Sequence, residues 1–76
     1  MNDTAPRQMS VFDPVSLGRA IRARRRSLGL LQSEAAMQSG VSRPTFIAIE
    51  QGKETARIGQ VMQICRDLGL RLTAEL

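Results

Sequence analysis

The chain has 76 residues, of which 11 are Lys or Arg and 7 are Asp or Glu, so its formal net charge is +4. A chain of this length forms one small domain with a limited apolar core, which a disulfide, a metal or a second subunit often reinforces. Because Cys65 is the single cysteine and there is no histidine, an internal disulfide is excluded and a metal site is not expected. A second copy of the chain is then the expected reinforcement.

The composition also argues against membranes and catalysis. No apolar run approaches the roughly 18 residues of a membrane span, and the first residues lack a signal-peptide core. No nucleophile–base pair, metal-activated water or Gly-rich phosphate loop is visible. We therefore expect a cytoplasmic protein that contacts no membrane, binds no cofactor and is not an enzyme.

The chain divides into three parts. Residues 1–12 are polar and unpatterned, which predicts a flexible N-terminal arm. Residues 13–69 carry helical periodicity and form the domain proper, and residues 70–76 follow a different pattern.

The first helix has clear start signals. Asp13 can be its N-cap and Pro14 fits its first turn, with Ser16 as a second candidate cap. Phe12, just before the cap, is expected to pack onto Leu17 as a hydrophobic staple.

One face of this helix is apolar, with Leu17, Ile21 and Leu28 in line and Arg25 among them, before Gly29 ends the helix. The outer surface is strongly basic, since five arginines lie within one short stretch: Arg19, Arg22, Arg24, Arg25 and Arg26. Such charge suits a polyanion, because neutralising phosphates releases counterions. The alternative is an ordinary solvated helix face.

Two short helices follow, joined by a tight turn at residues 39–41. The first covers residues 32–38 and buries its small apolar residues and Met37; the next runs from Ser42 to about residue 51, with Phe46 inward and Gly52 closing it. A tight turn sets the second helix at a steep angle, so its N-terminal residues stand clear of the domain. In a helix-turn-helix, those residues enter the major groove of DNA.

The fourth helix has the strongest periodicity. Its expected buried positions share one helical face and are Ile58, Val61, Met62, Cys65 and Leu68. Thr55 is the nearest candidate for its cap, and Gly69 ends it.

The last seven residues change to a two-residue period. Leu70, Leu72 and Ala74 alternate with polar residues, which is the pattern of a half-buried strand. A lone strand leaves its backbone groups unpaired, so we expect the same strand of a second copy to pair with it across a two-fold axis. The alternative is a frayed tail that pairs with nothing.

Two charges fall on inward faces: Arg25 in the first helix and Glu50 in the third. Each would be costly alone in a core, but together they can form a partly buried ion pair that fixes the first helix against the third.

The run LGLLQSEAAMQSGVSR at residues 28–43, followed by EQGK at residues 50–53, resembles the Xre/Cro family of helix-turn-helix repressors over about residues 17–69. The ending ICRDLGLRLTAEL is similar to that of HipB-type antitoxins, in which a C-terminal strand pairs between subunits. The resemblance implies an all-α, lambda-repressor-like bundle of four or five helices, with a C-terminal β-strand pairing across a homodimer.

The resemblance also implies site residues. Those that can face the bases are Arg43, Pro44, Thr45, Ile47 and Ala48, with Arg43 expected to read guanine. Those expected at phosphates are Gln32, Ser42, Lys53 and Arg22. Arg43 as a solvated side chain and Gln32 as a plain helix start are the alternatives.

Some positions depart from the family pattern. Leu31 stands where a capping Thr, Ser or Asn is usual, Ala35 replaces a core leucine, and Phe46 is larger than the usual aliphatic residue. Pro44 and Ala48 have no polar side-chain group, so base reading is expected to be sparse.

The implied function is that of a homodimeric repressor of a palindromic operator in double-stranded DNA. The HipB-like ending favours the antitoxin of a toxin–antitoxin operon that represses its own promoter and binds a cognate toxin. The alternatives are a toxin-inhibiting interaction module with secondary DNA binding, and a plain phage-type repressor without a toxin.

Overall fold

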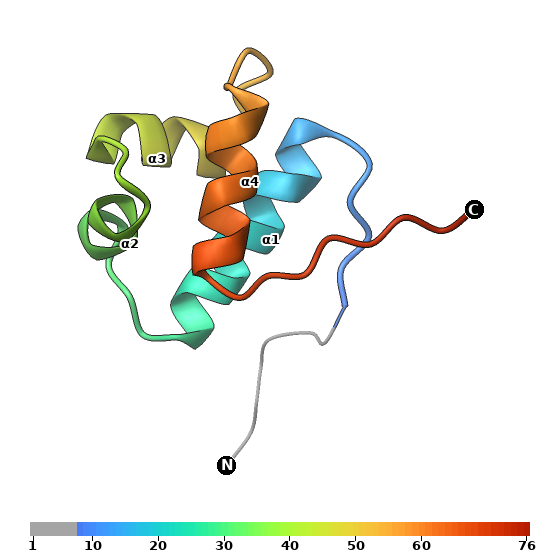
Figure 1. Cartoon of the computed structure of the whole chain (residues 1–76), viewed down its shortest axis with the longest axis horizontal. Helices are drawn as coiled ribbons and strands as arrows, with labels where there is room; N and C mark the ends of the chain where they lie inside the picture. Colours follow the sequence, from blue (N-terminus) through green and yellow to red (C-terminus); the bar gives the residue numbers. More distant parts are fainter. Residues whose placement is uncertain (1–7) are drawn as a thin grey trace.

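The computed structural model describes residues 8–76, which form four α-helices: α1 (Pro14–Ser27), α2 (Gln32–Ser39), α3 (Arg43–Glu50) and α4 (Ile58–Asp67) (Figure 1). The helices α2 and α3 lie together on one side, and α4 crosses α1. The predicted all-α helix-turn-helix bundle is confirmed, with four helices in this range and no fifth. Within it, no helix is long and apolar enough to span a bilayer.

The predicted C-terminal strand is not present in the single chain. Residues 71–76 are exposed and irregular, and they extend away from the side that carries α2 and α3 (Figure 1). The physical reason is that a strand needs a partner for its backbone, and residues 8–70 contain helices and turns but no strand. Of the predicted N-terminal arm, residues 1–7 lie outside the described residues, and residues 8–12 are exposed and irregular.

The start of α1 is built from two side chains that cap each other. The Asp13 carboxylate Oδ1 accepts a hydrogen bond from the Ser16 amide at 2.7 Å, and the Ser16 hydroxyl accepts from the Asp13 amide at 3.1 Å. Both candidate caps are therefore used, Asp13 as N-cap and Ser16 as its reciprocal partner. The hydrogen bonds from the Ser16 side chain and backbone lower the pKa of Asp13.

The expected staple at this end is wrong. The Phe12 side chain is 81% exposed, whereas Leu17 packs inward against the core. Because Leu17 is turned toward the core, it offers no surface for Phe12 to cover.

The core joins all four helices. Its fully or nearly fully buried apolar side chains are Ile21, Ala35, Ala36, Phe46, Ile49, Val61, Ile64, Cys65 and Leu68. The unusual Ala35 and Phe46 belong to this one cluster, in which α3 packs on α1 and α2, and α2 packs on α4. Burial raises the pKa of the Cys65 thiol, which sits here as an ordinary core side chain.

The buried stripe of α4 is rotated relative to the prediction. Ile58 and Met62 are 70% and 40% exposed, while Ile64 is fully buried. The helix begins at Ile58 with Arg57 as N-cap, so Ile58 lies at an open end, and Thr55 is not the cap. The buried positions from Val61 onward then fall at i, i+3, i+4 and i+7.

Two further apolar residues are more exposed than expected. Met37 is 82% exposed, because α2 is only two turns long and Ala35 and Ala36 already fill its inner face. Leu28 is 44% exposed, because α1 ends at Ser27 and Leu28 belongs to the turn that follows.

Contact between α1 and α3 depends on one small residue. A Cβ atom added to Gly18 would lie 2.4 Å from the backbone oxygen of Glu50, closer than any real contact. Gly18 is buried, so α1 meets the C-terminal end of α3 through its backbone. This close approach sets the position of α3 on the domain.

Candidate nucleic-acid interface

The turn between α2 and α3 fixes where α3 begins. Gly40 adopts a left-handed conformation with φ of 69°, which residues with a side chain rarely adopt. The amide of the next residue, Val41, donates to the Ala36 carbonyl at 3.0 Å, and the Val41 side chain packs against the core. The chain therefore leaves α2 in one defined direction.

The predicted cap of α3 is confirmed. The Ser42 hydroxyl accepts from the Thr45 amide at 3.2 Å and donates to the Thr45 hydroxyl at 2.8 Å. The Ser42 and Thr45 hydroxyls thus share one hydrogen bond within the turn. Of their two hydroxyl protons, one therefore remains for an external acceptor.

The helix α3 has one buried and one open face. Phe46, Ile49 and Glu50 are buried, Arg43 and Pro44 are exposed, and the three remaining predicted groove residues are partly buried: Thr45, Ile47 and Ala48. The open face therefore presents one cation, one hydroxyl and several apolar groups at the N-terminal end of the helix.

A buried ion pair holds α3 against α1. The Arg25 Nε donates to Glu50 Oε2 at 2.6 Å and the Arg25 Nη2 to Glu50 Oε1 at 3.3 Å, with side-chain exposures of only 10% and 2%. The Arg25 Nη1 also donates to the Leu30 carbonyl at 2.7 Å, which ties in the loop before α2. The structure thus brings the two predicted partners together as a forked pair.

Gln32 belongs to the same network. Its Nε2 donates to Glu50 Oε1 at 3.0 Å, so Gln32 links the first turn of α2 to α3. Since the nitrogen side of the amide must face the carboxylate, the orientation of the side chain is set. One N–H of the amide remains for another acceptor.

The start of α2 lacks the usual capping side chain, as the sequence predicts. Leu31 occupies the cap position and offers no acceptor. Instead the Glu34 carboxylate accepts from the Leu31 amide at 2.8 Å, so one half of the capping arrangement survives.

An open hollow of about 550 Å³ lies on one side of α3 and is the first of two basic hollows. We call it the α1-side hollow, and it is lined by Arg22, Arg25, Arg26, Leu30, Leu31, Gln32, Ser33 and Arg43. Arg22 and Arg26 are one helical turn apart on α1 and are exposed. Three residues predicted to contact DNA, Arg22, Gln32 and Arg43, therefore line one concave surface.

The second hollow, of about 450 Å³, lies on the other side of α3. This α4-side hollow is lined by Pro44, Thr45, Ala48, Ile49, Lys53, Thr55, Ala56, Arg57 and Gln60. Lys53 and Arg57 supply its positive charge and are both exposed. The open face of α3 is thus flanked by cations on both sides.

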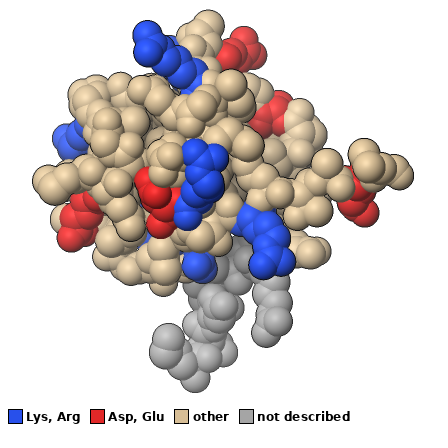
Figure 2. Space-filling view, viewed as in Figure 1, with Lys and Arg blue, Asp and Glu red and all other residues tan. Residues whose placement is uncertain are grey.

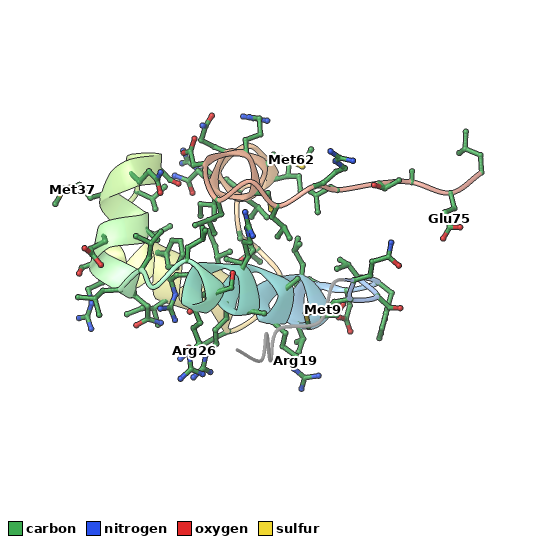
Figure 3. The ribbon with its side chains drawn as sticks, turned by 90° about the horizontal axis from the view of Figure 1, so that it is seen from below. Met9, Arg19, Arg26, Met37, Met62 and Glu75 are labelled. Atoms are coloured by element: carbon green, nitrogen blue, oxygen red, sulfur yellow. The ribbon has the colours of Figure 1, made fainter. Side chains whose placement is uncertain are left out.

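The basic residues of α1 do not share one direction. In Figure 3, Arg19 and Arg26 point away from α4, on the far side of α1. Figure 2 shows the face that carries α4, on which positive and negative side chains are scattered and most of the surface is uncharged. The face with α4 therefore does not form a concentrated basic surface.

The sequence predicted no site role for five polar residues that line the two hollows: Arg26, Ser33, Thr55, Arg57 and Gln60. The i, i+4 spacing of Arg22 and Arg26 is a signal that could have found Arg26. For the other four we find no comparable signal, since their place depends on how α2 and α4 pack. Among residues 8–76, no three His, Cys, Asp or Glu side chains gather as a metal site.

Comparisons with known proteins also indicate a helix-turn-helix domain. A family model described as a helix-turn-helix domain matches residues 16–76. The HTH-type transcriptional regulator y4mF of Sinorhizobium fredii, itself uncharacterised, is 38% identical over 56 residues, which cover 74% of each chain.

Solved structures share the fold. A HipB–O4 20mer complex superposes with a TM-score of 0.79 at 24% identity, covering 88% of this chain and 94% of the other; a HipA–HipB–O2–O3 complex gives 0.78 at the same identity and coverage. The restriction-modification controller protein C.AhdI from Aeromonas hydrophila gives 0.69 at 25% identity, covering 78% and 86%.

The resemblance to Xre/Cro-type regulators is confirmed by these matches. The family model covers α1 from Ser16 onward and all of α2 to α4, and so includes the open face of α3 and both hollows beside it. The chain belongs to the helix-turn-helix family of transcriptional regulators.

Proposed function

We propose that this protein is a homodimeric, sequence-specific repressor that binds a palindromic operator with α3 in the major groove. The observation that carries the proposal is the position of α3 between two basic hollows. A helix inserted in the major groove has a phosphate backbone on each side. Cations on both sides of one exposed helix end suit that arrangement.

The phosphate contacts divide between the two hollows. On the α1 side, Arg22 supplies charge and Gln32 offers its remaining N–H, held in place by Glu50. On the α4 side, Lys53 is the predicted contact. At the start of α3, we propose that Ser42 faces a phosphate, with the hydroxyl proton that the Ser42–Thr45 pair leaves free as the donor.

Base reading rests mainly on Arg43, whose exposed guanidinium can bind the O6 and N7 of guanine. The other residues proposed to face the groove offer methyl, methylene and ring groups: Pro44, Ile47 and Ala48. Such groups can contact thymine methyls but donate no hydrogen bond. We therefore propose that DNA shape contributes part of the selectivity.

The second copy is proposed to pair through residues 70–76. Within residues 8–76, the backbone groups of residues 71–76 make no hydrogen bond, and the segment points away from α2 and α3 (Figure 1). Antiparallel pairing of two such segments would satisfy these groups, with Leu70, Leu72 and Ala74 on one face. It would also leave both α3 helices free to meet DNA.

Selection from a random duplex library tests this function. The expected result is a two-fold symmetric sequence whose half-sites are about 10–10.5 base pairs apart, with guanine at a position that Arg43→Ala no longer selects. Recovery of single, unpaired half-sites would refute the dimer, and recovery of no consensus would refute sequence-specific binding.

A toxin partner is the second part of the proposal. Its support is the shared fold with HipB, which the solved HipA–HipB–O2–O3 complex contains together with HipA. In this proposal the protein acts in the cytoplasm, at the nucleoid, and represses its own operon. Co-expression with the neighbouring gene tests it: a co-purifying partner supports an antitoxin, and deletion of residues 1–12 tests the arm as its binding segment. Absence of any complex would favour a plain phage-type repressor.

A further inference from the structure

Arg24 takes part neither in the ion pair nor in the hollows, but it does make a hydrogen bond to another helix. Arg24 is partly buried, and its Nε donates to the carbonyl oxygen of Leu68 at 2.8 Å. Leu68 is the C-cap of α4, so the bond runs from α1 to the point where the chain leaves the last helix. The carbonyls at a helix C-terminus lack partners within the helix, and a cation there also meets the negative end of its dipole.

The turn after α4 is closed by two further hydrogen bonds. The Gly69 amide donates to the Arg66 carbonyl at 3.0 Å, and the Leu70 amide donates to the Cys65 carbonyl at 2.8 Å. Gly69 has a φ of 69°, which reverses the chain direction. Leu70 is partly buried against the core, and from residue 71 onward every residue is exposed. The direction of the tail is therefore decided between Leu68 and Leu70.

The Arg24 guanidinium also covers this turn. A Cβ atom added to Gly69 would lie 3.2 Å from the Arg24 Nη2, so the guanidinium lies directly over the residue that reverses the chain. No other side-chain hydrogen bond within residues 8–76 reaches Leu68, Gly69 or Leu70. Figure 1 shows the consequence: the tail leaves the end of α4 beside α1 and crosses toward the side opposite α2 and α3.

We propose that Arg24 is a positioning residue that fixes the direction of residues 70–76. It thereby sets the distance between the two α3 helices of the dimer. This inference rests on the proposed function, because it assumes that residues 70–76 pair between copies. If the tail leaves at a different angle, the second copy is displaced, and half-sites at a different spacing fit the pair of α3 helices better. Arg24 itself contacts no DNA in this proposal.

The test compares Arg24→Met, which keeps the apolar stem and loses the donor, with Arg24→Lys, which keeps a cation able to reach the carbonyl. Arg19→Met is the matched control, since it removes the same charge from an exposed position of α1. Each variant is titrated by fluorescence anisotropy against palindromic duplexes that differ only in half-site spacing, and against a single half-site. The single half-site reports whether α3 still reads DNA.

We expect the wild type to prefer one spacing. In Arg24→Met, the ratio of the affinity for the preferred spacing to that for the other spacings should fall roughly tenfold, the factor that one hydrogen bond from a charged donor is worth. The affinity for a single half-site should be unchanged. Arg24→Lys should restore most of the spacing preference, and Arg19→Met should retain it. An Arg24→Met variant that binds every duplex more weakly but keeps the wild-type spacing profile would overturn the inference.

A second measurement separates this inference from the proposed function. NMR order parameters for the amides of residues 69–71 need no DNA, and they should fall in Arg24→Met and remain at the wild-type value in Arg19→Met. If the wild type shows no preference among spacings, the proposed dimeric operator binding fails, and Arg24 then sets no spacing. If the wild type prefers one spacing but the order parameters are unchanged in Arg24→Met, the proposed role of Arg24 is overturned and the proposed dimeric function stands.

Discussion

Replacement of Arg25 by methionine should be among the most destabilising single changes in this chain. The variant removes both hydrogen bonds from Arg25 to Glu50 and the one to the Leu30 carbonyl, while the Glu50 side chain stays only 2% exposed. Glu50 would keep Gln32 as its remaining partner. Removal of one partner from a buried ion pair costs about 3–5 kcal/mol, because the other charge is left uncompensated.

This cost is large for so small a domain. A loss of 1 kcal/mol lowers the melting temperature of a 60–100-residue domain by about 4–8 °C, so Arg25→Met should melt at least about 12 °C below the wild type. Thermal and urea unfolding followed by circular dichroism at one fixed protein concentration measures it, since dimerisation makes stability concentration-dependent. Arg19→Met, at an exposed position of the same helix, should stay within about 0.5 kcal/mol of the wild type.

The double variant Arg25→Met/Glu50→Met decides whether the charge is the cause. An apolar pair of similar volume is often as stable as the ion pair it replaces, so the double variant should recover most of the loss. If Arg25→Met costs less than about 1 kcal/mol, or if the double variant is as unstable as the single one, the reasoning about Glu50 as a buried, compensated charge is refuted.

Further predictions concern the packing at two glycines, the cap of α1 and two proposed DNA contacts. Gly18→Ala should lower the free energy of unfolding by about 1–3 kcal/mol, because its Cβ would meet backbone 2.4 Å away; Gly59→Ala, in open space on α4, should raise it by about 0.5–1 kcal/mol in the same urea titration. Asp13→Asn should flatten the pH dependence of unfolding at low pH: the pKa of Asp13 is lowered in the fold, so its stabilisation is present above the usual aspartate pKa and is lost as the pH falls through the lowered one. Lys53→Ala should reduce the slope of log affinity against log salt by about 1 and weaken all duplexes alike, whereas Arg43→Ala should cost about 1–3 kcal/mol on the selected operator alone.

Clear outcomes would contradict each of these. A Gly18→Ala variant as stable as Gly59→Ala would show that α1 and α3 can separate without loss. An Asp13→Asn variant with an unchanged low-pH profile would show that the cap does not titrate in this range. If Lys53→Ala weakened binding to the selected operator more than to other duplexes, the assignment of Lys53 to a phosphate would be contradicted.

Local signals in the sequence predict the starts of α1 and α3 correctly, although Thr55 is not the cap of α4. Asp13 and Ser42 cap their helices as expected, and Gly40 takes the left-handed conformation that its turn requires. These features depend on neighbours within four residues, so the sequence contains all the relevant information. The pairing of Arg25 with Glu50 was also predictable, since a buried charge needs a partner and the chain offers few.

Features that depend on packing were predicted less well. Ile58 and Met62 fit the helical period as well as Ile64 does, and only the placement of α4 on α2 decides which side chains are buried. Gly18 shows no signal in the sequence, because its role exists only where α1 meets the backbone of α3. The predicted staple between Phe12 and Leu17 is wrong for the same reason, since Leu17 packs against the core instead.

The candidate site divides in the same way. The residues on the open face of α3 could be predicted from the motif, because their spacing along one helix determines which of them share a face. The two hollows could not be predicted, because each is lined by side chains from separate elements. Arg26 and Arg57 are examples. The phosphate contact that the resemblance implies for Ser42 stays a prediction, since Ser42 and Thr45 share one hydrogen bond and leave one hydroxyl proton free.

The most direct test of the central claim, that α3 reads DNA between two phosphate contacts, is a ratio of dissociation constants. The wild-type protein is titrated at about 0.15 M salt with its selected palindrome and with a shuffled duplex of the same composition. We predict that the palindrome binds at least about 10³-fold more tightly, the lower end of the range for specific regulators. A ratio near one would contradict the claim and leave α3 as a helix that meets DNA only through charge.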